Sequence, residues 1–319
     1  MVYSGRHNNV WNQICPVGRI DLQLGRDVRT VVASIAIAVL SPAAHVCSAA
    51  PPGGTLIPIV NAGFESNPVA PGCFAGFLPT AWSTYDPNGI LDGASDAVGC
   101  VHADGSPFYP VGGAPEGVNI ALIFLNGDTG GGPVGLFQNL PAVLQANERY
   151  TLQGQIGNIL SAVGPPPCDV FGFFNLNGFP GYRLQLLAGG VVVLEDNNSL
   201  FGTIPEGEFR FTRVSTTIQP GHPQIGQPLA VRLINQNIAG PPEAPGVEVN
   251  FDDIRLYRGC VDAGDLDDND DVNAADLALF IDVLLGVDSN ATHVERSDAN
   301  CSGAADGRDI AAFVEIMLG

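Results

Sequence analysis

The stretch that decides the fold is Tyr182–Glu195, which reads YRLQLLAGGVVVLE. Its two halves, 182–188 and 191–195, are rich in aliphatic residues and are separated by the pair Gly189-Gly190. Two adjacent glycines supply the positive φ angles that a two-residue hairpin turn of the primed type requires. We therefore expect two antiparallel strands joined by this turn.

Similar short segments extend outward from this hairpin in both directions. Within 150–156, Tyr150, Leu152 and Ile156 alternate with polar residues, which is the period of a half-buried strand. The segments 209–218, 229–234 and 247–257 continue the series, and many of the 40 Gly and 25 Pro fall between such segments. The pattern predicts a mainly β fold for residues 50–260, an antiparallel sandwich of the jelly-roll type.

The N-terminal region has the features of a secretory signal peptide. An apolar run at 31–40 follows Arg26 and Arg29 and precedes the small residues of 47–50. Ten residues are too few to cross a bilayer, which needs about 20. We predict a signal peptide over 1–49, no stable membrane span, and a secreted or cell-surface protein. A short membrane anchor or an interior helix is the alternative.

Export permits disulfide bonds, and five cysteines follow the predicted cleavage site. Because the number is odd, at least one thiol stays unpaired or pairs between chains. We expect Cys73 to pair with Cys100 and Cys260 to pair with Cys301.

The charge of the chain is strongly negative, since 13 basic residues, all Arg, face 33 acidic ones for a net charge of −20. This balance argues against nucleic acid or anionic membranes as partners and favours a cationic ligand. The composition changes at Cys260, because residues 261–319 hold 14 carboxylates and two Arg, whereas 50–260 hold 17 and seven. We expect a separate acidic module over 261–319.

This acidic module repeats itself at an offset of 33 residues, so that Asp265 falls on Asp298 and Phe280 on Phe313. Polar residues occupy loop positions 1, 3, 5, 9 and 12, with a carbonyl at 7, which is the ligand spacing of an EF-hand calcium loop. The predicted ligands are Asp265, Asp267, Asn269, Asp271, Asn273 and Asp276 in one loop, and Asp298, Asn300, Ser302, Ala304, Asp306 and Asp309 in the other.

Each loop leads into apolar residues at helical spacing, which predicts one amphipathic helix per repeat. Calcium suits these oxygen-rich loops better than zinc, because neither contains His. The crowded carboxylates of the first loop repel one another, so we expect this module to fold only with bound metal. A solvated acidic linker is the alternative interpretation.

Asp at position 12 instead of Glu, and loops without a preceding helix, make the module similar to a type I dockerin. That resemblance implies two calcium ions, a small all-α calcium-binding domain, and docking onto a cohesin-like protein domain. In that family, loop positions 10 and 11 commonly contact the partner. The matching residues are Ala274, Ala275, Gly307 and Arg308.

The β-rich part begins with the motif NAGFE at 61–65 and ends with NFDDIRL at 250–256, and the pair resembles the galactose-binding-like folds of carbohydrate-binding modules. The resemblance implies a polysaccharide ligand and a structural calcium site made of Glu65 with Asp252 or Asp253. The open alternative is that these carboxylates cap strand ends or pair with Arg255. Trp82 and Tyr85 are candidate ligand platforms, or else core aromatics.

The sequence carries little sign of catalysis, because the three His after the leader are isolated and no nucleophile elbow or metalloprotease motif occurs. We therefore expect a non-catalytic exported protein, attached through its calcium module to a cohesin-type partner and binding polysaccharide through its sandwich. The alternatives are an adhesive or matrix protein with a calcium clasp, and an unrecognised glycoside hydrolase that acts on O-glycosyl bonds.

Overall fold

The computed structural model describes residues 54–93, 96–126, 131–238, 246–269 and 271–318. The predicted signal peptide over 1–49 therefore lies outside the described residues. Within the described part, no helix has both the length and the apolar character needed to cross a membrane.

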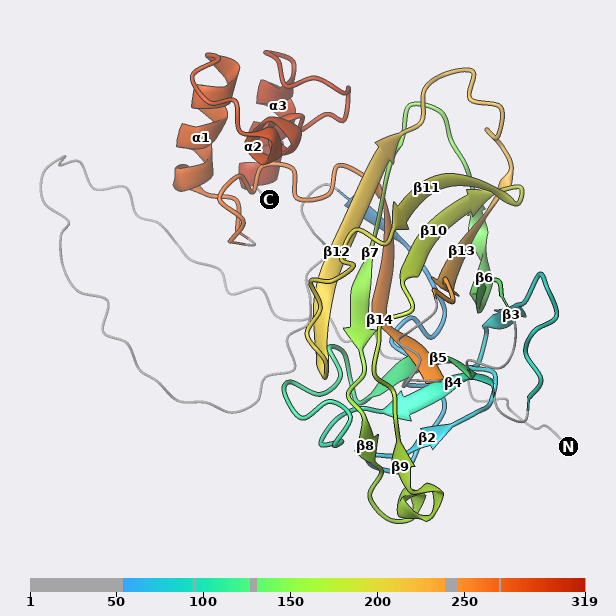
Figure 1. Ribbon diagram of the computed structural model, residues 1–319. Helices are drawn as coiled ribbons and strands as arrows, with labels where there is room; N and C mark the ends of the chain where they lie inside the picture. The colour runs from blue at the N-terminus through green and yellow to red at the C-terminus, as the bar shows by residue number, and fades with distance from the viewer. Residues whose placement is uncertain (1–53, 94–95, 127–130, 239–245, 270, 319) are drawn as a thin grey trace, which may run out of the picture. The chain divides into compact units, whose positions relative to one another are not determined.

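Two large antiparallel sheets and one two-stranded sheet make up the β-rich part of the described residues (Figure 1). The first has seven strands in the order β12-β7-β14-β5-β4-β2, with β1 paired to β14. Its strands are β1 Gly54–Ile57, β2 Phe74–Ala75, β4 Ala97–His102, β5 Asn119–Asn126, β7 Arg149–Asn158, β12 Glu208–Thr217 and β14 Gly246–Gly259. The second has five strands in the order β11-β10-β13-β6-β3. These are β3 Ser83–Tyr85, β6 Val134–Val143, β10 Tyr182–Ala188, β11 Val191–Asn197 and β13 Pro228–Asn235.

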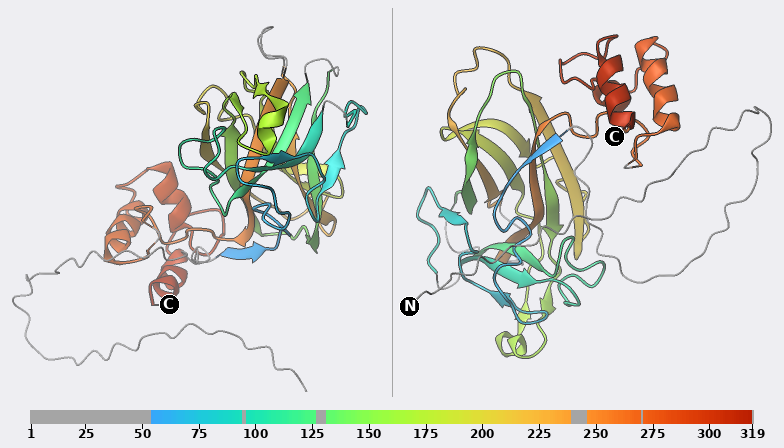
Figure 2. Two further views of the ribbon diagram at one scale, coloured as in Figure 1. Left: turned by 90° about the horizontal axis from the view of Figure 1, so that it is seen from below. Right: turned by 180° about the vertical axis from the view of Figure 1, so that it is seen from behind.

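The predicted hairpin is confirmed, because β10 and β11 pair on either side of Gly189 and Gly190, whose φ angles are 58° and 82°. The long strand β14 pairs with β5, β7 and β1, and β1 lies beside its C-terminal half (Figure 2). The prediction of a mainly antiparallel β fold is thus confirmed, while the jelly-roll connectivity stays a prediction.

Strand β5 is buried on both of its faces, which explains why its sequence, NIALIFLN, is nearly all apolar. Ala121, Ile123 and Leu125 pack into the core between the two sheets. Ile120 and Leu122 point the other way, into a second apolar cluster on the outer face of the seven-stranded sheet. A cover of loops and a small hairpin therefore lies over β4 and β5.

That small hairpin consists of β8 Ala162–Val163, the 3-10 turn η1 Cys168–Phe171 and β9 Phe173–Phe174. A disulfide joins Cys168 of the hairpin to Cys73, with 5.6 Å between their Cα atoms. The expected Cys73–Cys100 bond is wrong, because the pairing of β2 with β4 sets Ala75 against Cys100 and leaves Cys73 beyond it. Cys100 is instead a buried free thiol in the core between the sheets, and the predicted Cys260–Cys301 bond is confirmed.

Replacing both Cys73 and Cys168 by Ala is expected to lower the free energy of unfolding by about 2–5 kcal/mol, because the bond closes a long loop of the unfolded chain. The separation along the sequence is 95 residues. Urea unfolding of the full chain measures the change. Reduction of the wild-type protein breaks Cys260–Cys301 as well and should lower the stability at least as much. Equal stability of the reduced and oxidised proteins would contradict the prediction.

The C-terminal residues form three helices, α1 Ala274–Leu284, α2 Ala291–Ser297 and α3 Asp309–Leu318. The sequence predicted α1 and α3 but not α2. The matched residues Phe280 and Phe313 stack with their ring centroids 4.0 Å apart, and both are buried. The predicted apolar stripe is only partly correct, because Ile281, Leu285, Ile310, Val314 and Leu318 are exposed.

Candidate active site

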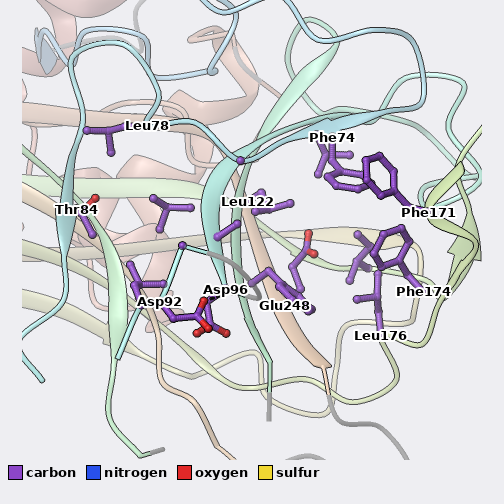
Figure 3. A pocket seen from close by; sticks show the side chains of 18 of the residues that line it. Phe74, Leu78, Thr84, Asp92, Asp96, Leu122, Phe171, Phe174, Leu176 and Glu248 are labelled. Atoms are coloured by element: carbon purple, nitrogen blue, oxygen red, sulfur yellow. Dashed lines mark hydrogen bonds between the residues drawn. The ribbon is translucent and has the colours of Figure 1, made fainter. Parts of the chain in front are cut away.

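A cavity of about 810 Å³ lies on the outer face of the seven-stranded sheet, between β4, β5, β14 and the small hairpin (Figure 3). Most of its lining is apolar or aromatic. The lining side chains include Phe74, Leu78, Thr84, Asp86, Leu91, Asp92, Asp96, Val101, Phe108, Leu122, Phe124, Ile159, Phe171, Phe174, Leu176 and Glu248. Its volume falls in the range of small-molecule sites, and its apolar lining with a few polar groups is typical of them.

Glu248 is the most unusual of these residues, because it carries a carboxyl group and is only 3% exposed. It lies on β14 opposite Phe124 of β5, which in turn lies opposite Ala97 of β4. Burial among these strands raises the pKa of Glu248 to about 7, and a hydrogen bond from Asn250 opposes only part of that rise. Near neutral pH the side chain is therefore divided between carboxylic acid and carboxylate.

Two hydrogen bonds in series, from Tyr109 to Asn250 and from Asn250 to Glu248, support the Glu248 carboxyl group. Asn250 Nδ2 donates to Glu248 Oε1 over 2.8 Å and to the carbonyl oxygen of Ala121 over 2.9 Å. Tyr109 donates its hydroxyl to Asn250 Oδ1 over 2.6 Å. Burial raises the pKa of Tyr109 well above its usual value, and the charges of Glu248 and Asp252 add to the rise, so Tyr109 stays a neutral donor. The amide of Asn250 is thereby fixed toward Glu248.

Three phenylalanines form the aromatic wall of the cavity, and their labels stand together in Figure 3. The Phe74 ring centroid lies 5.3 Å from that of Phe171 and 5.1 Å from that of Phe174. The Cys73–Cys168 disulfide ties Phe74 on β2 to the hairpin that carries the other two rings. The cavity thus combines a buried carboxyl group of raised pKa, Glu248, with an aromatic wall, which suits the protonation of a largely apolar molecule.

A family model described as HpiC1 cyclase matches residues 55–257, which is more than half of the chain. The chain belongs to the HpiC1-like cyclase family. The match covers both sheets and every residue of the cavity. Among curated proteins, the comparison finds no match.

Solved structures of cyclases from Fischerella sp. are similar to this HpiC1-like chain. An apo cyclase is 38% identical with a TM-score of 0.54, over 64% of this chain and 96% of that one. A Stig cyclase in complex with (3Z)-3-(1-methyl-2-pyrrolidinylidene)-3H-indole is 37% identical with a TM-score of 0.53, over 64% and 98%. A cyclase in complex with 4-(1H-indol-3-yl)butan-2-one is 38% identical with a TM-score of 0.52, over 64% and 97%.

Membership of the HpiC1-like family corrects the functional expectations drawn from the sequence. The prediction of a non-catalytic adaptor with a polysaccharide-binding sandwich is wrong, because the matched family consists of cyclases, which are enzymes. The dockerin resemblance and the cohesin-like partner are not supported either, since the comparisons indicate cyclases that bind small molecules. The adhesive and glycoside hydrolase alternatives gain no support from this match.

The two candidate ligand platforms lie outside the cavity. Trp82 is 3% exposed, donates its Nε1 hydrogen to the carbonyl of Asn61 over 3.0 Å, and stacks on Phe64. It is a core aromatic, which was the alternative that the sequence left open. Tyr85 lies on β3 under the guanidinium of Arg232, 4.3 Å from its ring centroid.

The carboxylates expected to form a structural calcium site in the sandwich have several protein partners. Glu65 accepts hydrogen bonds from the backbone of Val118 and Asn119, over 2.8 and 2.6 Å. Asp252 is fully buried and accepts from the backbone of Glu116 over 2.8 Å. Asp253 pairs with Arg255 over 2.6 Å, which was the alternative reading of this residue. The structure thus brings Glu65, Asp252 and Glu116 into one region.

In the first C-terminal loop, Asp265, Asp267 and Asp276 each place an oxygen within 4.8 Å of the others. Asp276 is fully buried and accepts hydrogen bonds from the backbone of Leu266, Asp267 and Asn273. Arg296 also reaches this loop and pairs with Asp268. The sequence interpretation missed that Arg296 offsets part of the repulsion among the loop carboxylates.

The second loop repeats these hydrogen bonds at the 33-residue offset. Asn300 and Asp306 donate their backbone N–H groups to Asp309, over 3.0 and 2.7 Å, as Asp267 and Asn273 donate to Asp276. Ser302 donates to Asp298 as Asn269 donates to Asp265. Ala274, Ala275, Gly307 and Arg308, the expected partner-binding residues, are exposed.

Sequence reasoning missed Glu248, Glu116 and the Asn250–Tyr109 support, although NFDDIRL contains Asn250. A faint signal was present, because Glu248 interrupts the apolar strand pattern at Val247, Val249 and Phe251. An acidic residue in such a pattern indicates either an exposed face or a site, and only the strand register decides between them.

Proposed function

We propose that the protein is an acid-catalysed cyclase whose reaction takes place in the cavity beside Glu248. The observation that carries this proposal is a nearly fully buried carboxyl group, with a pKa of about 7, in an apolar cavity of the domain that matches the cyclase family. A general acid works best when its pKa lies near the working pH.

The proposed reaction is an isomerisation and needs no oxidant or reductant. The protonated Glu248 gives its proton to an unsaturated group of the substrate, and a nucleophilic π bond or heteroatom of the same molecule closes the ring. The cyclised cation then loses a proton, which returns to the Glu248 carboxylate directly or through water. The faces of Phe74, Phe171 and Phe174, which line the cavity, stabilise the transient positive charge.

We further propose that the substrate contains an indole or an aromatic group of similar size. Two of the similar Fischerella cyclases were solved with indole-bearing molecules. The aromatic wall and a volume of about 810 Å³ are compatible with such a ring and an attached chain.

Calcium is the metal that we propose for the C-terminal loops. Oxygen ligands from Asp, Asn, Ser and backbone carbonyls suit this hard cation, and Asp265, Asp267 and Asp276 already gather in the first loop. The repeated hydrogen bonds around Asp309 support a second ion in the other loop. A structural ion near Glu65 and Asp252 in the sandwich is proposed on the same chemistry. Secretion or display at the cell surface also remains our proposal.

The test is to incubate the full chain with indoles that carry an unsaturated side chain and to analyse the mixture by chromatography and mass spectrometry. We expect a product of unchanged mass and new retention time, formed only with active protein. Heat-treated protein is the control. A panel that yields no isomer, or products of changed mass alone, would contradict the proposed cyclisation.

A further inference from the structure

The charges that line the cavity are all negative. Among the described residues that line it, Asp86, Asp92, Asp96 and Glu248 are acidic, and none is Arg or His. Two loop aspartates lie close together, because Asp96 donates its backbone N–H to Asp92 Oδ1 over 3.2 Å. The cavity therefore has an acidic end in addition to its aromatic wall.

The acidic end lies next to Glu248. Ala97, the residue after Asp96, belongs to the cross-strand row that contains Phe124 and Glu248. Figure 3 shows the carboxyl groups of Asp92 and Asp96 on one side of Glu248 and the rings of Phe171 and Phe174 on the other. A ligand that spans the cavity would touch the aspartates, the acid and the aromatic wall in that order.

Asp96 is the buried member of the acidic end, whereas Asp92 is exposed and Asp86 is half-buried. Asp96 is 4% exposed, and its Oδ1 accepts the backbone N–H of Asn126 over 2.6 Å, which fixes the carboxylate against the cavity. Asp86 at the rim is held ionised, since hydrogen bonds from the backbone of Ile90 and Leu91 outweigh burial and lower its pKa. A buried carboxylate such as that of Asp96 attracts a cation and repels an anion more strongly than it would in water.

Building on the proposed function, we infer that the substrate carries a cationic nitrogen, as an ammonium or protonated amine, that binds at Asp92 and Asp96. This contact places the aromatic body against Phe74, Phe171 and Phe174 and the reacting atoms at Glu248. The overall charge of −20 draws such a cation toward the protein and holds anionic analogues away.

Three matched probes test the inference by calorimetry with the full chain at low ionic strength. Tryptamine, tryptophol and indole-3-propionate share an indole and a two-carbon link but end in a cation, a neutral hydroxyl and an anion. We expect tryptamine to bind about tenfold or more tightly than tryptophol, and indole-3-propionate to bind most weakly. Calcium should not compete with tryptamine.

Asp96→Asn keeps the acceptor for Asn126 but removes the charge, so it should weaken tryptamine binding by about tenfold and change tryptophol binding by less than about twofold. Asp282→Asn, which removes an exposed charge on α1, is the matched control and should change neither.

The inference is overturned if tryptamine does not bind, or if it binds no more tightly than tryptophol. It is also overturned if calcium competes with tryptamine, or if Asp96→Asn weakens both probes equally. These binding results are independent of the cyclase test. The proposed cyclase function fails if no isomer forms, whether or not the cavity prefers a cationic ligand.

Discussion

Glu248→Gln is expected to lower the turnover number for cyclisation by about 10²- to 10⁴-fold, which is the usual contribution of a positioned general acid. Gln has nearly the shape of Glu and keeps the oxygen that accepts the hydrogen bond of Asn250, but it has no proton to give. Steady-state kinetics on the isomerising substrate measure the loss. The Michaelis constant should change much less than the turnover number.

Unfolding measurements separate this effect from misfolding. The pKa of Glu248 is raised in the folded state, so the native protein holds a proton that the unfolded chain releases between the ordinary pKa of Glu and about 7. The stability of the wild type therefore falls as the pH rises through this window, by about 3 to 4 kcal/mol at most. Glu248→Gln has no carboxyl group to ionise, so its stability should not fall in this pH window. At pH 8 it should be at least as stable as the wild type. Full activity in the variant would contradict the assigned role.

Removal of calcium is expected to abolish most of the helical signal of residues 274–318. Asp265 and Asp276 are buried together, and Arg296 compensates only part of their charge. Because the ion would bind the folded loops and not the extended chain, its binding energy becomes folding energy for these helices. Circular dichroism of the full chain, with chelator and after readdition of calcium, measures the change, while the strand signal should persist.

Two variants on the same helix make this test specific. Asp276→Asn removes a charge from the predicted loop ligands and should weaken calcium binding by about tenfold or more. Asp282→Asn removes an exposed charge from α1 and should leave binding unchanged. An undiminished helical signal in chelator, with no heat on calcium addition, would contradict metal-coupled folding.

Local sequence patterns predicted the parts of the fold that local rules control. Gly189-Gly190 predicted the turn between β10 and β11, and the 33-residue offset predicted the helices α1 and α3 that follow the two loops. The hydrogen bonds around Asp276 and Asp309 match at the same offset. No local sequence pattern predicts the cavity, because its residues come from segments that are far apart in the sequence. Its acid comes from β14, its wall from β2 and the β8–β9 hairpin, and its acidic end from the segment before β4, which only the sheet register and the Cys73–Cys168 bond bring together.

The functional expectation failed for a related reason. The motifs around Glu65 and Asp252 lie at the two ends of the β domain, and folds of this class carry binding modules and enzymes alike. The proposed catalytic acid, Glu248, has no unusual property in the sequence, because it is the pairing with β5, and of β5 with β4, that buries it. Its burial raises its pKa, and no composition or spacing argument contains that information.

The pH dependence of kcat/KM reports the ionisation of the free enzyme and is the most direct measurement of whether protonated Glu248 is the acid. We expect kcat/KM to be constant at mildly acidic pH and to fall tenfold per pH unit above an apparent pKa of about 7, as Glu248 loses its proton. A profile that stays level or rises between pH 6 and 9 would contradict the assignment of Glu248 as the catalytic acid.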